Sequence, residues 1–91
     1  MAQKRVEIYY SGNVQGVGFR FTADRLAPVF KIAGYVKNTP DGKVKIVAEG
    51  DEEKLKSFLT AVQNEMGHYV RDKEIDWSPP TGEFKDFGLK F

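Results

Sequence analysis

The sequence predicts an α+β fold with the element order β-α-β-β-α-β. Several segments alternate apolar and polar residues as strands do, whereas two segments between them carry apolar residues at spacings of three and four. A third observation is the turn Thr39-Pro40-Asp41-Gly42, which joins two of the strand segments directly. Strands connected in this way by a hairpin and by helices predict an antiparallel sheet of four or five strands with both helices on one face.

The first strand is predicted over residues 4–12, where one face carries the apolar set Val6, Ile8 and Tyr10. A glycine-rich loop follows over residues 13–19. Because glycine tolerates backbone conformations that other residues avoid, this loop can turn sharply and direct several backbone N–H groups toward one point.

The first helix is predicted over residues 20–32. Its buried stripe recurs at helical spacing and comprises Phe19, Ala23, Leu26, Ala27 and Phe30. Pro28 lies inside this segment, where proline removes a helical N–H group and its ring crowds the carbonyl of Asp24. We therefore expect a kink or an early end of the helix near Pro28.

The second and third strands are predicted over residues 33–38 and 43–49, as an antiparallel hairpin. In the turn between them, proline fixes φ and glycine can adopt a positive φ. The third strand alternates cleanly, and one of its faces carries Val44, Ile46 and Ala48. In the second strand, Asn38 has the same parity as Val36, so we expect its side chain on the face against which the glycine-rich loop closes.

The second helix is predicted to begin after Asp51, which is a suitable N-cap residue. Glu52 and Glu53 follow in the first turn, where the helix dipole favours negative charge. The helix should end near Gly67. Its apolar stripe comprises Leu55, Phe58, Leu59, Val62 and Met66.

The last part of the chain predicts two further extended segments. Residues 69–77 look extended, but Val70 and Ile75 fall on opposite parities, which predicts a bulge or a strong twist. After a loop over residues 78–82, a final strand is predicted from the alternation of Phe87, Leu89 and Phe91. The complete order is that of the ferredoxin-like, split β-α-β architecture.

Length and composition limit the possible classes of protein. The 91 residues predict one domain, residues 1–91, that buries roughly 60–65% of its unfolded surface. The absence of cysteine excludes disulfides, a thiolate nucleophile and cysteine-based metal sites. A net charge of +1 argues against broad binding to nucleic acid or anionic membranes. Because no apolar run has the length of a signal peptide or a membrane span, we expect a cytoplasmic protein.

The junction between the first strand and the first helix has the composition of an anion-binding site. The glycine-rich loop leads into a helix N-terminus, which offers free N–H donors and a positive partial charge. Arg20 at the start of the helix adds a fork of donors shaped for phosphate or carboxylate. On position alone, however, Arg20 could equally be a solvated residue at a helix start, and Asn38 could be a turn residue.

Two blocks of sequence at a defined spacing resemble the acylphosphatase family. They are Val14-Gln15-Gly16-Val17-Gly18-Phe19-Arg20 and Gly34-Tyr35-Val36-Lys37-Asn38, followed by Asp41-Gly42. The resemblance continues through Glu49-Gly50 and Phe87-Gly88-Leu89-Lys90-Phe91, so it covers nearly the whole chain.

This resemblance implies an enzyme that hydrolyses the carboxyl–phosphate bond of acyl phosphates. The products are a carboxylate and inorganic phosphate, and the phosphate would also be a competitive ligand. In that family an arginine at the end of the glycine-rich loop binds the phosphate, and an asparagine at the end of the second strand positions the attacking water. The matching positions here are Arg20 and Asn38.

The residues offered by these blocks suit positioning rather than acid–base catalysis. A carboxylate leaving group departs without a proton, and the transition state of phosphoryl transfer mainly requires that its oxygens be held. The phosphate-binding groups are expected to be the side chain of Arg20 and the backbone N–H groups of Gln15, Gly16, Val17, Gly18 and Phe19. Because the motif has no well-placed carboxylate or histidine, we expect the phosphate itself to take the proton of the water. No spacing suggests a metal site, and no cofactor is expected.

The leading interpretation is a small, monomeric, metal-free acylphosphatase that binds neither nucleic acid nor membranes. A second is a non-catalytic module of the same fold that binds phosphate or a carbamoyl-phosphate-like ligand, as in larger carbamoyl-transfer proteins; a chain ending at its own last strand favours the first. A third is an RNA-binding sheet that uses Tyr9, Tyr10 and Tyr35, although the third strand has no aromatic residue. Few side chains look available to recognise the acyl half, so we expect loose specificity for it.

Overall fold

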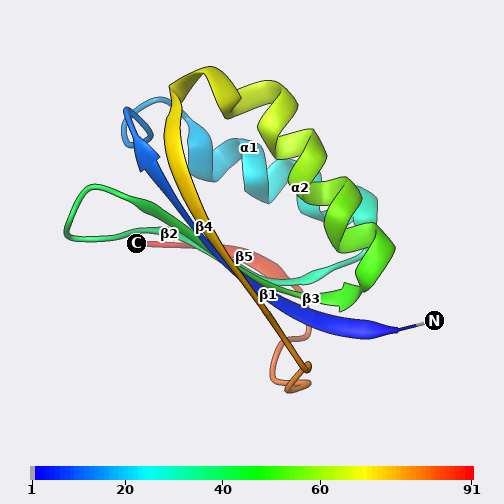
Figure 1. Cartoon of the computed structure of the whole chain (residues 1–91). Helices are drawn as coiled ribbons and strands as arrows, with labels where there is room; N and C mark the ends of the chain where they lie inside the picture. The colour runs from blue at the N-terminus through cyan, green and yellow to red at the C-terminus, as the bar shows by residue number, and fades with distance from the viewer. Residues whose placement is uncertain (1) are drawn as a thin grey trace.

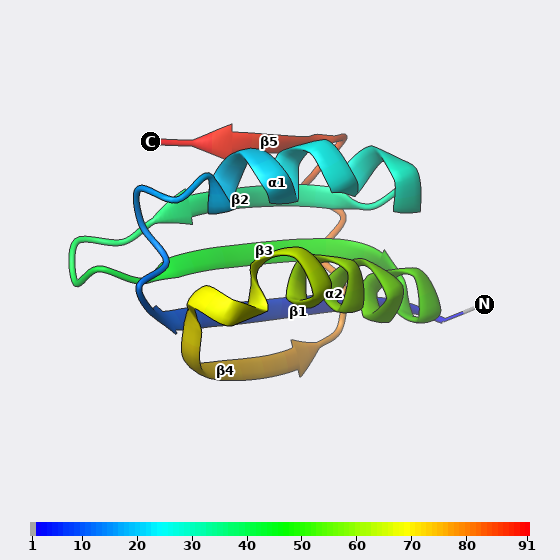
Figure 2. The same cartoon turned by 90° about the horizontal axis from the view of Figure 1, so that it is seen from above.

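The computed structural model describes residues 2–91 and contains a five-stranded sheet with two α-helices on one face (Figures 1 and 2). The elements, in chain order, are β1 (Gln3–Gly12), α1 (Phe19–Leu26), η1 (Ala27–Phe30, a 3₁₀ helix), β2 (Ala33–Asn38), β3 (Val44–Asp51), α2 (Glu52–Met66), η2 (Gly67–Tyr69, a 3₁₀ helix), β4 (Val70–Ser78) and β5 (Phe87–Lys90). The predicted β-α-β-β-α-β order and the ferredoxin-like arrangement are therefore confirmed. No helix within this part of the chain has the length and apolar character needed to cross a membrane.

The sheet is mixed, which corrects the prediction of a purely antiparallel one. Its order is β4-β1-β3-β2-β5, and neighbouring strands are antiparallel except for β2 and β5, which are parallel. The segment between β4 and β5 carries the chain from one edge of the sheet to the other. The last strand then enters beside β2 in the same direction, with Gly34 opposite Phe87 and Val36 opposite Leu89.

The apolar faces predicted for the strands and helices meet between the sheet and the helices. Val6, Ile8 and Tyr10 of β1 are buried, as are Leu55, Phe58, Val62 and Met66 of α2. The ring of Tyr10 lies 4.8 Å from that of Phe19, measured between centroids, and so joins β1 to the start of α1. The core thus fixes the position of α1 and of the loop that precedes it.

Helix α1 is shorter than the predicted 20–32, because it ends at Leu26 and continues as the 3₁₀ helix η1. Pro28 lies in the first turn of η1, where its missing N–H group leaves no hydrogen bond unmade. The early end that was expected near Pro28 is confirmed. Ala27 is nevertheless buried and Phe30 packs against the core, so the predicted stripe spans both elements.

Two finer predictions have different outcomes. The bulge predicted for residues 69–77 is confirmed, because Ser11 pairs with Asp72 and Gly12 with Val70, leaving Arg71 as an extra residue in β4.

The N-cap predicted for Asp51 is correct in position but not in chemistry, since its side chain makes no capping hydrogen bond. The backbone N–H of Glu52 instead donates to the carbonyl of Ala2 at 2.9 Å.

A buried carboxylate holds the loop between β4 and β5 against the sheet. Glu49 accepts hydrogen bonds from Arg5 Nη1 at 2.7 Å, from the backbone N–H groups of Thr81 (3.0 Å) and Gly82 (2.9 Å), and from Thr81 Oγ1 at 2.7 Å. Burial alone would raise the pKa of Glu49, but these hydrogen bonds together lower it from its ordinary value of 4.5 to about 2.

The lowered pKa of Glu49 predicts a stability contribution that depends on pH. A carboxylate whose pKa is lower in the folded state stabilises the protein fully above its unfolded pKa, and this stabilisation is lost as the pH falls toward about 2. We expect Glu49→Gln to destabilise the protein by about 1–3 kcal/mol at neutral pH. Denaturant unfolding of both proteins should show this difference shrinking between about pH 5 and pH 2. A difference that does not change with pH would contradict the prediction.

Candidate active site

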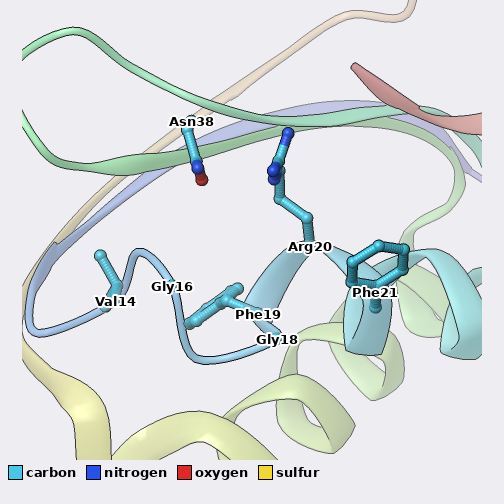
Figure 3. A pocket seen from close by; sticks show the side chains of 7 residues that line it. All are labelled: Val14, Gly16, Gly18, Phe19, Arg20, Phe21 and Asn38. Atoms are coloured by element: carbon cyan, nitrogen blue, oxygen red, sulfur yellow. The ribbon is translucent and has the colours of Figure 1, made fainter. Parts of the chain in front are cut away.

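A small cavity of about 240 Å³ lies where the loop between β1 and α1 approaches β2. Its lining comes from the loop, from the first residues of α1 and from the end of β2, as Figure 3 shows. The lining residues are Val14, Gly16, Gly18, Phe19, Arg20, Phe21 and Asn38. The cavity therefore brings together the two residues that sequence analysis predicted to be catalytic, although 18 positions separate them in the chain.

The loop reaches its shape through glycines with positive φ. Gly16 has a φ of 77° and Gly18 a φ of 84°, in the left-handed region that other residues rarely adopt. Gly18 immediately precedes α1, and its carbonyl accepts the hydrogen bond of the Thr22 N–H at 3.0 Å. The amides of Phe19, Arg20 and Phe21 precede this first helical hydrogen bond, so they have no partner within the helix. The N-terminus of α1 therefore presents amide donors at the cavity.

Arg20 is held in place by the C-terminal strand. Its Nη1 donates to the carbonyl of Lys90 at 2.9 Å, and its guanidinium carbon lies 4.9 Å from the centre of the Phe91 ring. Within residues 2–91, Nε and Nη2 of Arg20 make no hydrogen bond. One side of the guanidinium group thus fixes its position, while the other donors are free to bind an anion.

Asn38 is the last residue of β2, where it pairs with Val44 of β3. Val36, two residues earlier, is buried on the helix-facing side of the sheet. Asn38 lies on the same side, and its half-buried side chain points from the strand toward the loop (Figure 3). This position agrees with the orientation that the strand parity of Asn38 and Val36 predicted.

The structure divides the six predicted phosphate-binding residues into two groups. Gly16, Gly18, Phe19 and Arg20 line the cavity. The side chains of Gln15 and Val17 do not, because Val17 packs against the core and Gln15 points to the turn between β2 and β3. For these two residues, the backbone amide alone remains a candidate ligand of phosphate.

Gln15 ties the loop to the hairpin that carries Asn38. Its Nε2 donates to the carbonyls of Thr39 and Lys43, each at 2.9 Å. The N–H and carbonyl of Thr39 also pair with Lys43 and Gly42, so the turn is itself well ordered by hydrogen bonds. This clamp fixes the loop relative to the residue that follows Asn38.

We expect Gln15→Leu to lower kcat about tenfold, because a shift of about 1 Å between the loop and Asn38 is enough to disturb in-line geometry. The affinity for inorganic phosphate should change less, since the backbone amide of residue 15 is retained. Steady-state kinetics on an acyl phosphate, with phosphate as inhibitor, measures both quantities. The same substitution at Gln63, on α2, is the matched control and should leave kcat unaltered. Equal losses in kcat and in phosphate affinity would contradict a purely positioning role for the side chain.

Sequence analysis missed two residues of the cavity. Val14 is 1% exposed and lines the cavity, but one valine in a glycine-rich segment gives no periodic signal. Phe21 lies off the apolar stripe of α1 and 67% of it is exposed, so helical periodicity assigned it no role. An aromatic residue on the polar face of a short helix is the signal that could have indicated it.

Arg20 is the one ionisable side chain among the residues that line the cavity. Residues 2–91 also contain no group of three or more His, Cys, Asp or Glu side chains arranged to hold a metal ion. The lining therefore offers backbone hydrogen-bond donors, the positive charge of Arg20 and the side-chain amide of Asn38. This set suits the binding of an anion and the orientation of a small molecule.

Comparisons with known proteins agree with the resemblance drawn from the sequence. The family model described as Acylphosphatase matches residues 6–89. An acylphosphatase of Leuconostoc mesenteroides is 42% identical over 88 residues, which cover 96% of this chain and 98% of that protein. The crystal structure of acylphosphatase from Bacillus subtilis superposes with a TM-score of 0.87 at 36% identity and covers 97% of this chain and 99% of that one.

The chain also resembles part of a larger protein. The crystal structure of T. kodakarensis HypF matches with a TM-score of 0.80 at 36% identity, over 97% of this chain but 12% of that one. The family match and the full-length relatives confirm the predicted family and the predicted enzyme class, acylphosphatase. The chain therefore belongs to the acylphosphatase family.

Proposed function

We propose that this protein hydrolyses the carboxyl–phosphate bond of acyl phosphates, with phosphate bound by the glycine-rich loop and Arg20 and water positioned by Asn38. The observation that carries the proposal is the single cavity shared by Gly16, Gly18, Arg20 and Asn38. Family membership supports the general reaction. The roles of the individual residues are inferred from the geometry of the cavity.

The phosphate half of the substrate is assigned to the loop and the start of α1. The amides from Gln15 to Phe19 and the free donors of Arg20 would surround the phosphoryl oxygens. Backbone amides and a fixed guanidinium suit a loose transition state, in which negative charge spreads over those oxygens. Because the core and β5 already hold these groups, they need little rearrangement when the substrate binds.

The attacking water is assigned to Asn38, whose side-chain oxygen would accept a hydrogen bond and place the water in line with the carboxylate leaving group. The oxygen–phosphorus bond to the carboxylate breaks as the bond from water forms. The carboxylate leaves as an anion and needs no proton. Among the lining residues no carboxylate or histidine is present to act as a base, so the water's proton passes to a phosphoryl oxygen.

Hydrolysis of acetyl phosphate in the presence of EDTA tests the proposal. Turnover well above the spontaneous rate, inhibited competitively by inorganic phosphate, is the expected result. Absence of turnover by the folded protein, or turnover that requires an added metal ion, would overturn it. Light scattering on the same protein would test our further proposal that it is a monomer. We also propose that the protein is cytoplasmic and that residues 1–91 form one domain, for which a single cooperative unfolding transition is expected.

The likeness to one segment of HypF favours a second candidate, a binding module of the same fold that holds phosphate or a carbamoyl-phosphate-like ligand. Such a module would bind inorganic phosphate at the cavity without hydrolysing acetyl phosphate. Calorimetric phosphate binding combined with absent turnover would therefore favour the module, whereas binding with turnover favours the enzyme. We also propose that the protein does not bind nucleic acid. A salt-sensitive complex with RNA would contradict this part of the proposal.

A further inference from the structure

An exposed aromatic ring lies at the edge of the cavity. Five large apolar residues are exposed in the described part of the chain, and they are Phe21, Val29, Ile75, Trp77 and Phe91. Of these, Phe21 lines the cavity together with Arg20 and Asn38. Single exposed apolar residues are common on protein surfaces. Phe91 also lies against the guanidinium group of Arg20, but it does not line the cavity, so lining the cavity is what distinguishes Phe21.

Phe21 does not pack in the core, unlike the apolar residues next to it on α1. Phe19 and Ala23 of the same helix are 2% and 0% exposed and belong to the core, whereas Phe21 is 67% exposed. Figure 3 shows Phe21 on α1, one residue after Arg20, among the side chains that line the cavity. The ring therefore contributes little to folding but offers an apolar surface to a molecule bound at Arg20.

The size of the cavity indicates which part of a substrate meets this surface. Pockets that enclose whole drug-sized ligands measure roughly 300–1,000 Å³, and this cavity of about 240 Å³ is smaller. With a phosphoryl group at the loop and Arg20, the acyl group extends to the rim. Phe21 is the exposed apolar side chain among the lining residues there, and Val14 and Phe19 are buried.

We propose that Phe21 forms a binding surface for the acyl half of the substrate and gives the site a preference for aromatic and other large apolar acyl phosphates over acetyl phosphate. This inference rests on the proposed function, and it replaces the expectation of loose acyl specificity. Contact between an apolar acyl group and the Phe21 ring removes apolar surface of both from water. An acetyl group has too little surface to gain comparably.

The test compares benzoyl phosphate with acetyl phosphate as substrates of the wild type and of Phe21→Ala. We expect the ratio of their kcat/KM values to fall about fivefold in Phe21→Ala, the effect of losing a small apolar contact. Phe21→Tyr keeps the ring and should keep the ratio. Val29→Ala removes an equally exposed apolar side chain that does not line the cavity, and should also keep it.

The outcomes separate this inference from the proposed function. If the wild type hydrolyses both substrates but the ratio is unchanged in Phe21→Ala, or both rates fall equally, the inference is wrong and the proposed function stands. If neither substrate is hydrolysed, the proposed function is wrong. The binding constants of benzoylphosphonate and acetylphosphonate, which resist hydrolysis, then provide the same comparison. A ratio that depends on Phe21 supports the binding surface, and one that does not overturns it.

Discussion

Arg20→Ala is expected to remove measurable hydrolysis of acyl phosphates and binding of inorganic phosphate while the protein stays folded. The variant loses the one positive charge at the cavity and the donors that Nε and Nη2 offer to phosphoryl oxygens. Loss of a single preorganised donor lowers kcat about 10²–10³-fold in comparable sites. Removing a charged group with several donors should cost at least as much. Steady-state kinetics and phosphate calorimetry measure both effects.

Arg20→Ala should fold, because Arg20 lies at the surface end of α1 and its structural contacts are with the last two residues of the chain. Losing the hydrogen bond to the Lys90 carbonyl should cost about 1 kcal/mol of stability. Arg25→Ala is the matched control, since Arg25 lies on the same helix but pairs with Glu65 at 2.6 Å, outside the cavity. A folded Arg20→Ala protein with near-normal turnover would overturn the assignment.

Arg20→Lys separates charge from geometry. A lysine keeps the positive charge but cannot present two parallel donors to a phosphate. The single ammonium group of lysine also cannot bind the phosphate and donate to the Lys90 carbonyl at the same time, as the guanidinium group of Arg20 can. We therefore expect activity between those of the wild type and Arg20→Ala. The β5 strand therefore helps to define the phosphate site, because its Lys90 carbonyl holds the guanidinium group in place.

The sequence predicted those parts of the site that depend on local pattern. The strand parity of Val36 and Asn38 placed Asn38 on the side of the loop, and the glycines marked the turn that ends at α1. Both inferences use neighbours within a few residues, so they do not require knowledge of the sheet order. The apolar stripes of α1 and α2 were predictable for the same reason.

The parts that escaped prediction depend on contacts between distant segments. The parallel pairing of β5 with β2 has no local signal, because the loop before β5 could lead to either edge of the sheet. Without that pairing, the contact of Arg20 with Lys90 cannot be foreseen. The pairing of Arg5 with Glu49 likewise follows from the β1–β3 register, which the sequence of either strand alone does not specify.

Asn38→Ala should lower kcat about 10²-fold or more, with little change in the inhibition constant of inorganic phosphate. The variant keeps the loop, Arg20 and the clamp by Gln15, so the phosphate site is intact. What it loses is the side-chain oxygen at the cavity that would orient the water. Asn64→Ala, on the exposed side of α2, is the control and should behave as the wild type.

The pH dependence of the turnover rate of Asn38→Ala tests which group accepts the proton of the attacking water. An asparagine side chain does not ionise in the working range, so its loss should lower the pH–rate profile without altering its shape. If Asn38 acted together with an ionising side chain as the base, the variant would lose a limb of the profile. Because no carboxylate or histidine lines the cavity, an unaltered shape would support transfer of the proton to the phosphoryl group of the substrate.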